Sequence, residues 1–196
     1  MHDDKILRYA QNDNFFELYV IILILFPPVF YGDEQMTKHE VKIAFDEYAS
    51  LKELDITDQN ICQEAVKAMD NSHSPYSKFK VGAALQLQSG KVLYGSNQEN
   101  VAYPSGLCAE RVALFHWGAN HLDDPIVNLA ITAHTNDFEI LKPVTPCGSC
   151  LQVMAEYEKK QGKPIRILLY CIDGPIWVIN GIENLLPFLF FEERLA

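Results

Sequence analysis

The sequence is organised around two short stretches, Cys108-Ala109-Glu110-Arg111 and Pro146-Cys147-Gly148-Ser149-Cys150. Together they supply three thiols and one carboxylate, that of Glu110, two residues beyond the first thiol. A zinc ion held by three protein ligands keeps its fourth tetrahedral position for water, which distinguishes a catalytic site from a closed structural one. We therefore expect one Zn²⁺ per chain, with Glu110 as acid and base for the water and with these metal ligands: Cys108, Cys147 and Cys150.

Each stretch is predicted to open a helix. One helix is expected over 108–118, with its first cysteine near the N-cap, and the other over 146–160. Cys147 and Cys150 are three residues apart, so they share one face of a first helical turn. Zinc with three thiolates carries net negative charge, and two helix N-termini together with the cation of Arg111 would spread that charge.

A Cys-x-x-Cys pair also fits a thioredoxin-like redox site, because a helix N-terminus lowers the pKa of a thiol. Such a site needs no third cysteine followed by glutamate, so a metal site is favoured. His116 lies about 12 Å along the helix from Cys108, too far to share a zinc ion, and the other histidines lack ligand spacing with the thiols. Cys62 and Cys171 are expected to be buried structural residues.

The surrounding apolar pattern predicts an α/β fold, a mixed sheet covered by helices. A helix capped at Thr57 or Asp58 should come early, and Ser89-Gly90 should turn a hairpin. Alternating apolar residues over 41–45 indicate a short edge strand. The other strands are expected at 81–87, 92–95, 126–133, 165–171 and 176–179.

The composition suits one folded domain: 196 residues, 48% of them apolar and 21% charged. A net charge of −10 argues against a nucleic-acid partner, which needs a basic face, but not against a small neutral ligand. Five cysteines, an odd number, without a secretory signal pattern indicate thiols kept reduced in the cytoplasm.

The first 35 residues differ from the rest, so we expect an N-terminal extension over 1–35 and a single domain over 36–196. Leu18 to Phe26 is an unbroken apolar run that ends at Pro27-Pro28. A membrane-spanning helix needs about 20 such residues, so this run is too short to cross a bilayer. It is an arm that packs on the domain, a weak membrane-surface tag, or sequence upstream of the true start, and the ordinary pattern that begins at Met36 favours the last.

Asn97 and Glu99 are a candidate ligand-binding pair. In extended backbone their side chains point to the same side, about 7 Å apart. An amide and a carboxylate in this arrangement can hold two neighbouring hydroxyl groups of a sugar. The alternative is a solvated polar loop, and the residues alone leave both possibilities open.

The sequence resembles the cytidine deaminases, in particular the short homotetrameric class that binds zinc through three cysteines. The resemblance runs from about Ile61 to Leu195 and is carried by these stretches: Pro75 to Ala84, Asn97 to Asn100, Cys108 to Arg111, Pro146 to Gln152, and Leu185 to Pro187. It implies a three-layer α/β/α fold with a five-stranded mixed sheet. It also implies hydrolytic deamination of cytidine and 2′-deoxycytidine to the uridine nucleosides in pyrimidine salvage, with release of ammonia.

The same resemblance implies roles for further residues. The substrate-binding set is Phe79 at the base, Asn97 and Glu99 at the sugar hydroxyls, the backbone N–H of Ala109 at the pyrimidine carbonyl, and Phe190 in a neighbouring subunit's site. Phe188 and Phe191 are alternatives for that last role. Arg111 and Gln152 are expected to lie just behind the residues that bind metal and substrate.

One position departs from the family, and three rival functions remain. Leu151 stands where the family usually has arginine, which puts in doubt a charge contact at the subunit interface but not the chemistry. A deaminase of another cytosine compound, such as blasticidin S, shares the zinc motif but lacks the Asn-x-Glu pair. A nucleic-acid-editing deaminase is disfavoured by the acidic charge. A non-catalytic zinc module should close its metal with a fourth protein ligand, and none is spaced for it.

Overall fold

The computed structural model describes residues 36–192 and 194. The predicted N-terminal extension, 1–35, lies outside the described residues. Within them, the chain forms three α-helices: α2 (Ile56–Ala68), α3 (Ala109–Asn120) and α4 (Gly148–Gln161). None of the described helices is long and apolar enough to cross a membrane.

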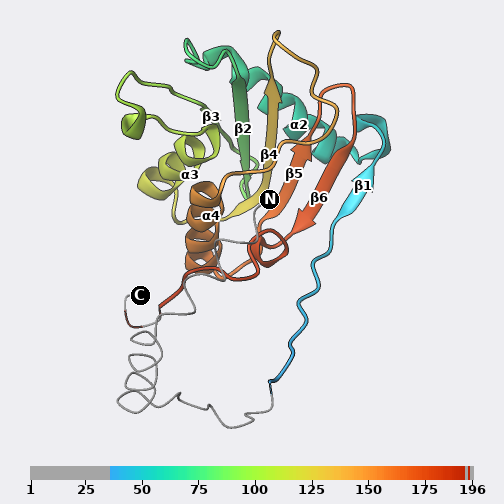
Figure 1. The fold of residues 1–196 in the computed structure, drawn as a ribbon, viewed down its shortest axis with the longest axis vertical. Coiled ribbons are helices and arrows are strands. Elements are labelled where there is room, and N and C mark those ends of the chain that lie inside the picture. Colours follow the sequence, from blue (N-terminus) through green and yellow to red (C-terminus); the bar gives the residue numbers. More distant parts are fainter. Residues whose placement is uncertain (1–35, 193, 195–196) are drawn as a thin grey trace, which may run out of the picture. The chain divides into compact units, whose positions relative to one another are not determined.

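A mixed sheet runs through the middle of the fold, with the strand order β1-β6-β5-β4-β2-β3. β4 and β5 are parallel, and the other neighbours are antiparallel. The α4 helix connects the two parallel strands (Figure 1). The strands are β1 (Asp46–Tyr48), β2 (Lys80–Leu87), β3 (Val92–Ser96), β4 (Ile126–His134), β5 (Arg166–Tyr170) and β6 (Ile176–Asn180).

Helices cover both faces of this sheet, which gives the three-layer α/β/α fold that was predicted (Figure 1). On one face α2 packs through Ile61, Cys62 and Ala65. On the other face lies the larger core, to which α3 contributes Leu114 and Trp117 and α4 contributes Met154. Cys62 is fully buried, as expected of a structural cysteine.

The sheet has six strands rather than the five that the resemblance implied, and the extra one is β1 at the edge. The edge strand was predicted at 41–45, but pairing with β6 begins only at Asp46. Val41 and Ile43 remain exposed, and the N–H of Ala44 donates to the side chain of Asn184, beyond the end of β6. The ladder with β6 therefore starts later than the alternating pattern indicates, and at Ala44 the chain bonds to the Asn184 side chain rather than to the backbone of β6.

The first helix begins slightly earlier than the sequence suggested. Its N-cap is Asp55, whose carboxylate accepts from the backbone N–H of Asp58 at 2.9 Å. Asp58 is itself buried and binds Arg166 of β5 at 2.6 Å. Its side chain therefore ties the helix to the sheet and is not the cap.

Gly95 allows α3 to approach the sheet closely. A Cβ atom at this position of β3 would collide with the carbonyl oxygen of Ala109 and lie 2.7 Å from the backbone nitrogen of Ala113. Since Ala109 is the first residue of α3, the missing side chain at Gly95 fixes the height of the helix start above the sheet.

We expect Gly95→Ala to push the start of α3 outward and to lower the free energy of unfolding by about 1–3 kcal/mol, as overpacking does. Because Cys108 precedes Ala109, zinc retention against a chelator should fall as well. The matched control is Gly82→Ala, where the new Cβ would collide with Ala65 of α2 on the opposite face of the sheet. It should destabilise the fold to a similar degree, while the folded fraction keeps its zinc. Equal zinc loss in both variants would contradict this account.

Candidate metal centre and active site

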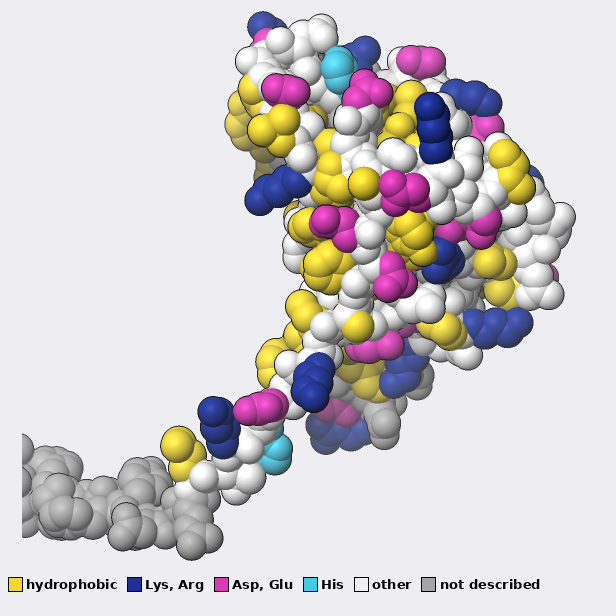
Figure 2. All heavy atoms as spheres, turned by 90° about the vertical axis from the view of Figure 1, so that its right-hand side faces the viewer, with side chains coloured by type: hydrophobic (Ala, Val, Ile, Leu, Met, Phe, Trp, Pro, Cys, Tyr) yellow, Lys and Arg dark blue, Asp and Glu magenta, His cyan; other side chains and the backbone are white. Residues whose placement is uncertain are grey.

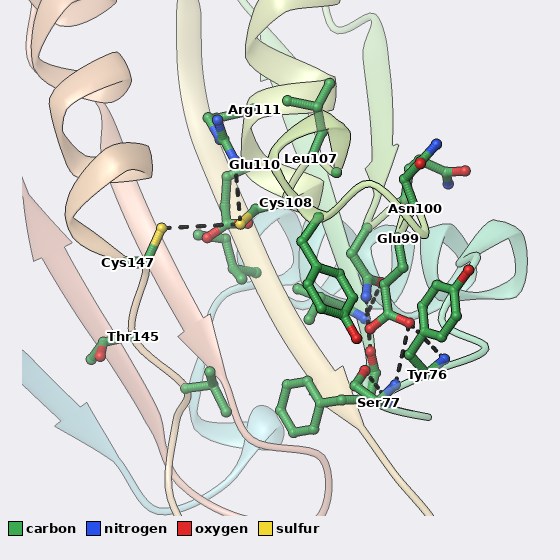
Figure 3. A pocket seen from close by; sticks show the side chains of 18 residues that line it. Tyr76, Ser77, Glu99, Asn100, Leu107, Cys108, Glu110, Arg111, Thr145 and Cys147 are labelled. Atoms are coloured by element: carbon green, nitrogen blue, oxygen red, sulfur yellow. Dashed lines mark hydrogen bonds between the residues drawn. The ribbon is translucent and has the colours of Figure 1, made fainter.

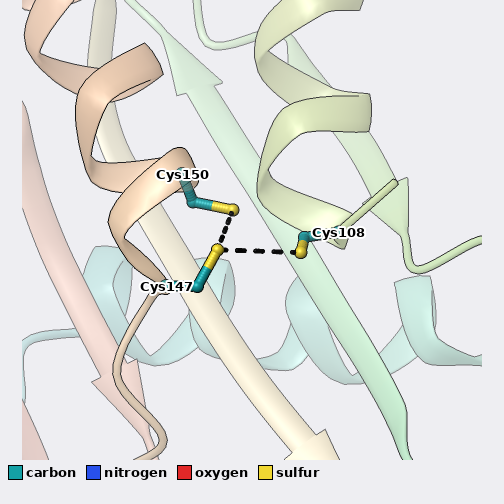
Figure 4. Close-up of side chains that lie close together, drawn as sticks. All are labelled: Cys108, Cys147 and Cys150. Carbon is teal, nitrogen blue, oxygen red and sulfur yellow. Dashed lines mark hydrogen bonds between the residues drawn. The ribbon is translucent and has the colours of Figure 1, made fainter. Parts of the chain in front are cut away.

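The three predicted cysteine ligands meet at the N-termini of two helices (Figure 4). Cys108 is the N-cap residue of α3 and Cys147 that of α4, and Cys150 lies in the first turn of α4. The three sulfur atoms all lie within 4.8 Å of one another. Cys147 Sγ is 4.0 Å from Cys108 Sγ and 3.5 Å from Cys150 Sγ.

This donor set fits zinc. With Zn–S bonds of about 2.3 Å, tetrahedral geometry places the sulfur atoms about 3.8 Å apart, and the two measured separations lie on either side of that value. The cysteines are the only group of possible metal ligands among the described residues, so no histidine joins them. Helix N-termini also suit an anionic sulfur cluster, because their free N–H groups point toward it.

The thiols influence one another strongly. Hydrogen bonding from Cys150, helped by Arg111 and Cys147, lowers the pKa of the Cys108 thiol to about 5. The same interaction with Cys108, together with burial, raises the pKa of Cys150. Ionisation of one thiol therefore makes ionisation of the next one harder, and a divalent cation is what allows all three to ionise together.

Glu110 lies beside the thiols in the first turn of α3 and is only 5% exposed. Burial raises the pKa of its carboxyl group above the usual range, and the nearby Cys108 adds to this effect. A carboxyl group that is easily protonated, next to a metal site, suits proton transfer in both directions.

Arg111 provides positive charge next to the sulfur atoms. Its Nη2 atom lies 3.9 Å from Cys108 Sγ, and its buried Nε atom has no hydrogen-bond partner among the described residues. A buried polar nitrogen without a protein partner is costly unless an anion lies nearby. The geometry therefore agrees with the predicted role of Arg111 in offsetting thiolate charge.

The metal ligands open onto a cavity of about 870 Å³ (Figure 3). Glu110, Arg111 and two of the cysteines lie at one end, and the segments before β2, after β3 and before α4 contribute most of the other lining residues. The lining residues are Tyr76, Ser77, Phe79, Val81, Asn97, Gln98, Glu99, Asn100, Tyr103, Gly106, Leu107, Cys108, Glu110, Arg111, Ile131, Val144, Thr145 and Cys147. Such a volume is ordinary for a small-molecule site.

Asn97 and Glu99 both line this cavity, but their side chains are engaged differently. The side-chain amide of Asn97 holds the backbone at the start of β2, because its Oδ1 accepts from Val81 N at 2.8 Å and its Nδ2 donates to Phe79 O at 2.8 Å. Glu99 Oε2 accepts from the backbone N–H groups of Tyr76 at 2.9 Å and Ser77 at 3.2 Å (Figure 3). The Ser77 side chain and these N–H groups hold the pKa of Glu99 below its usual value, so it faces the cavity as a carboxylate.

The remaining predicted residues divide into two groups. Phe79 lines the cavity, and Ala109 is fully buried at the start of α3. Gln152 and Phe190 are not among the cavity-lining residues. They bind each other instead, since Gln152 Nε2 donates to Phe190 O at 2.8 Å and Gln152 Oε1 accepts from Phe190 N at 3.3 Å. This pairing leaves the ring of Phe190 72% exposed.

Several lining residues were not predicted from the sequence. Tyr103 comes from a short 3₁₀ turn and meets Tyr76 edge-on, with ring centroids 6.0 Å apart. Val144 and Thr145 come from the segment that leads to Cys147. The sequence offers one indication for Val144 and Thr145: a segment that ends at a metal ligand must pass close to the site.

Comparison with known proteins agrees with this site. The profile of the cytidine and deoxycytidylate deaminase zinc-binding region matches residues 55–162. The chain belongs to this deaminase family. The matched region contains Glu110 and all three cysteines, so the chain is a zinc-dependent hydrolase and its cysteine cluster fits one zinc ion per chain.

Relatives within the family cover most of the described chain. The cytidine deaminase of Halalkalibacterium halodurans is 39% identical over 137 residues, which are 70% of this chain and 96% of that protein. That of Sporosarcina psychrophila is 40% identical over 138 residues, 70% of this chain and 94% of that protein. The crystal structure of cytidine deaminase from Burkholderia pseudomallei superposes with a TM-score of 0.57 at 35% identity, covering 67% of this chain and 97% of that one. The deaminase fold predicted from the sequence is thus confirmed.

We expect Arg111→Ala to release zinc faster under chelator challenge and to lower turnover, because the anionic sulfur cluster loses its nearest cation. Arg111→Lys should recover part of both, since it keeps a point charge without the planar fork of donors. Cys147→Ala is the reference for complete loss of zinc binding, because it removes a ligand and should lose both zinc and stability. If Arg111→Ala holds zinc as tightly as the parent, charge compensation is not its role.

Proposed function

We propose that the chain catalyses the hydrolytic deamination of cytidine and 2′-deoxycytidine to uridine and 2′-deoxyuridine, with release of ammonia, in pyrimidine salvage. The observation that carries this proposal is the buried carboxyl group of Glu110 beside three convergent thiols, at the end of a cavity large enough for a nucleoside. The names of the relatives support the choice of cytidine.

In the proposed mechanism Glu110 moves the protons. Zinc, when bound by the three cysteines, supplies Lewis-acid activation of a water molecule. Glu110 takes a proton from this water and delivers it to ring N3, while the water oxygen forms a bond to C4. Glu110 then takes the proton of the new hydroxyl group on C4 and passes it to the amino group, the C4–N bond breaks, and ammonia leaves as the C4 carbonyl forms. Burial of Glu110 suits both transfers, because it favours the protonated form between them.

The rest of the cavity supplies groups for the two other parts of a nucleoside. Phe79 offers an aromatic wall for the base, and the N–H of Ala109 at the start of α3 is a donor for the pyrimidine carbonyl. Glu99, anionic and fixed by two backbone N–H groups, is the acceptor for a sugar hydroxyl. Asn97 has one amide hydrogen left after its bond to Phe79 and can donate it to a hydroxyl.

The proposal extends to the oligomeric state of the protein and to its cellular compartment. We infer a homotetramer in which the exposed ring of Phe190, held at its backbone by Gln152, reaches the cavity of a neighbouring copy. We infer a cytoplasmic enzyme because all five cysteines are free thiols, three of them at a metal site. On the face shown in Figure 2, lysine and arginine side chains are interspersed with aspartate and glutamate, which supports a small-molecule partner over nucleic acid.

The proposal is tested by incubating the purified protein with cytidine, 2′-deoxycytidine, cytosine, CMP and blasticidin S and following the loss of absorbance. We expect turnover of the two nucleosides and much slower turnover of the other three compounds. Activity confined to blasticidin S or to CMP would replace the proposed substrate, and a protein that holds zinc but deaminates nothing would favour a binding module.

Glu110→Gln tests the mechanism while keeping the shape of a side chain that is only 5% exposed. The variant should fold, bind one zinc ion per chain and lose turnover by at least the factor of about 10² to 10⁴ that is typical of a missing general acid and base. Zinc content measured beside activity separates this role from that of a ligand. A variant without metal would make Glu110 a fourth ligand, and the site would then be closed.

We also propose that residues 36–196 form a single domain that functions without residues 1–35. Removing residues 1–35 should leave turnover, zinc content and oligomeric state unchanged, because the ordinary sequence pattern begins at Met36 and both described core clusters and the metal ligands lie within 36–196. Sedimentation and kinetics of the shortened protein check this. Aggregation, or a loss of more than a few-fold in turnover, would show that the apolar run packs on the domain.

A further inference from the structure

The segment between β4 and α4 shapes one side of the cavity. Near its end, Val144 and Thr145 line the cavity, and the segment leads directly to Cys147 at the metal site. Near its beginning lies Phe138, a large aromatic side chain that remains 61% exposed. An exposed phenylalanine contributes little to a core, but this one contacts a residue of the cavity wall.

The ring of Phe138 packs on the ring of Phe79. Their centroids are 6.1 Å apart and their planes differ by 22°, an arrangement close to parallel stacking. Phe79 borders the catalytic cavity, whereas Phe138 borders a separate hollow of about 290 Å³. Phe138 therefore contacts the predicted base-binding wall without being part of the cavity itself.

The segment keeps its path by bonds that do not involve the Phe138 ring. The backbone N–H of Asp137 donates to Thr135 Oγ1 at 3.3 Å, and the thiol of Cys171 donates to Ile140 O at 3.1 Å. Pro143 is buried. Removing the Phe138 ring should thus leave the segment, and the cysteine at its end, in place.

The backbone around Phe79 is also fixed independently, because the Asn97 side chain bonds to both Phe79 O and Val81 N. What remains free is the rotation of the Phe79 side chain about its own torsion angles. A half-buried ring with no neighbour must be ordered when a substrate binds, and this ordering weakens binding. A second ring stacked on it orders the side chain in advance.

We propose that Phe138 is a positioning residue that holds the Phe79 ring as a preformed wall for the planar ring of the substrate. The proposal rests on the proposed function, in which that planar ring is a pyrimidine. It concerns binding alone. The proton transfers depend on Glu110, which belongs to a different element, α3.

The test compares kcat and KM for cytidine in three variants. Phe138→Ala should raise KM about 2- to 10-fold, the range expected for loss of one aromatic pair, while kcat and zinc content stay at the parent values. Phe138→Tyr keeps a ring and should restore KM. The matched control is Leu141→Ala, in the same segment and beside the same hollow, with a side chain that is 72% exposed; it should leave KM unchanged.

A double variant separates positioning from a general structural effect. In a Phe79→Ala background the ring to be positioned is gone, so Phe138→Ala should add no further rise in KM. Additive effects, an unchanged KM in Phe138→Ala, or an equal rise in Leu141→Ala would each overturn the proposal while the parent still turns over cytidine. A parent that deaminates no nucleoside would overturn the proposed function itself and this inference with it.

Discussion

Three thiol groups within 4.8 Å of one another are the constraint on which the site depends. Thiolates at such distances repel one another, and the hydrogen bond between Cys108 and Cys150 lowers the pKa of the first thiol while it raises the pKa of the second, so that one sulfur keeps its proton. A divalent cation, two helix N-termini and the guanidinium of Arg111 all act against it. Metal–ligand distances vary by only about 0.2 Å, so the fold has to bring two helix starts accurately to one point.

Packing between the two helices and the sheet provides that accuracy. Gly95 lets α3 rest almost directly on β3, and α4 is placed by the crossover between the parallel strands β4 and β5. Further along, Tyr157 of α4 packs edge-on against Trp117 of α3, with ring centroids 5.3 Å apart. The helices are thus fixed relative to each other at points distant from the sulfur atoms, and the ligand geometry follows from the packing of the whole layer.

The residues that could be predicted from the sequence are those whose role depends on local spacing. Cys108 at a helix start, with Glu110 two residues later, is a local pattern, and the structure confirms its geometry. The use of the Asn97 amide could not be predicted in this way, because its partner Val81 is brought near by the β2–β3 pairing. The stacking of Phe138 on Phe79 was missed for the same reason: it joins two loops, and no periodic pattern links them. The edge strand was displaced because the ladder with β6 starts at Asp46 and the N–H of Ala44 bonds to the side chain of Asn184, a distant residue that the pattern over 41–45 does not encode.

Leu151 stands where the resemblance to the cytidine deaminases implies an arginine, so this position adds no positive charge. Leu151 packs against the larger core, and among the described residues that line the cavity Arg111 is the one with a cationic side chain. The guanidinium of Arg111 faces the sulfur atom of Cys108. Three thiolates with one zinc ion leave a net negative charge, so the sulfur cluster uses this cation. Within the described part of the chain, no other lining cation is then left to pair with a phosphate, and the carboxylate of Glu99 would repel one. The electrostatics of the cavity therefore favour a nucleoside over a nucleotide, by repulsion of the charged competitor as much as by attraction of the neutral one.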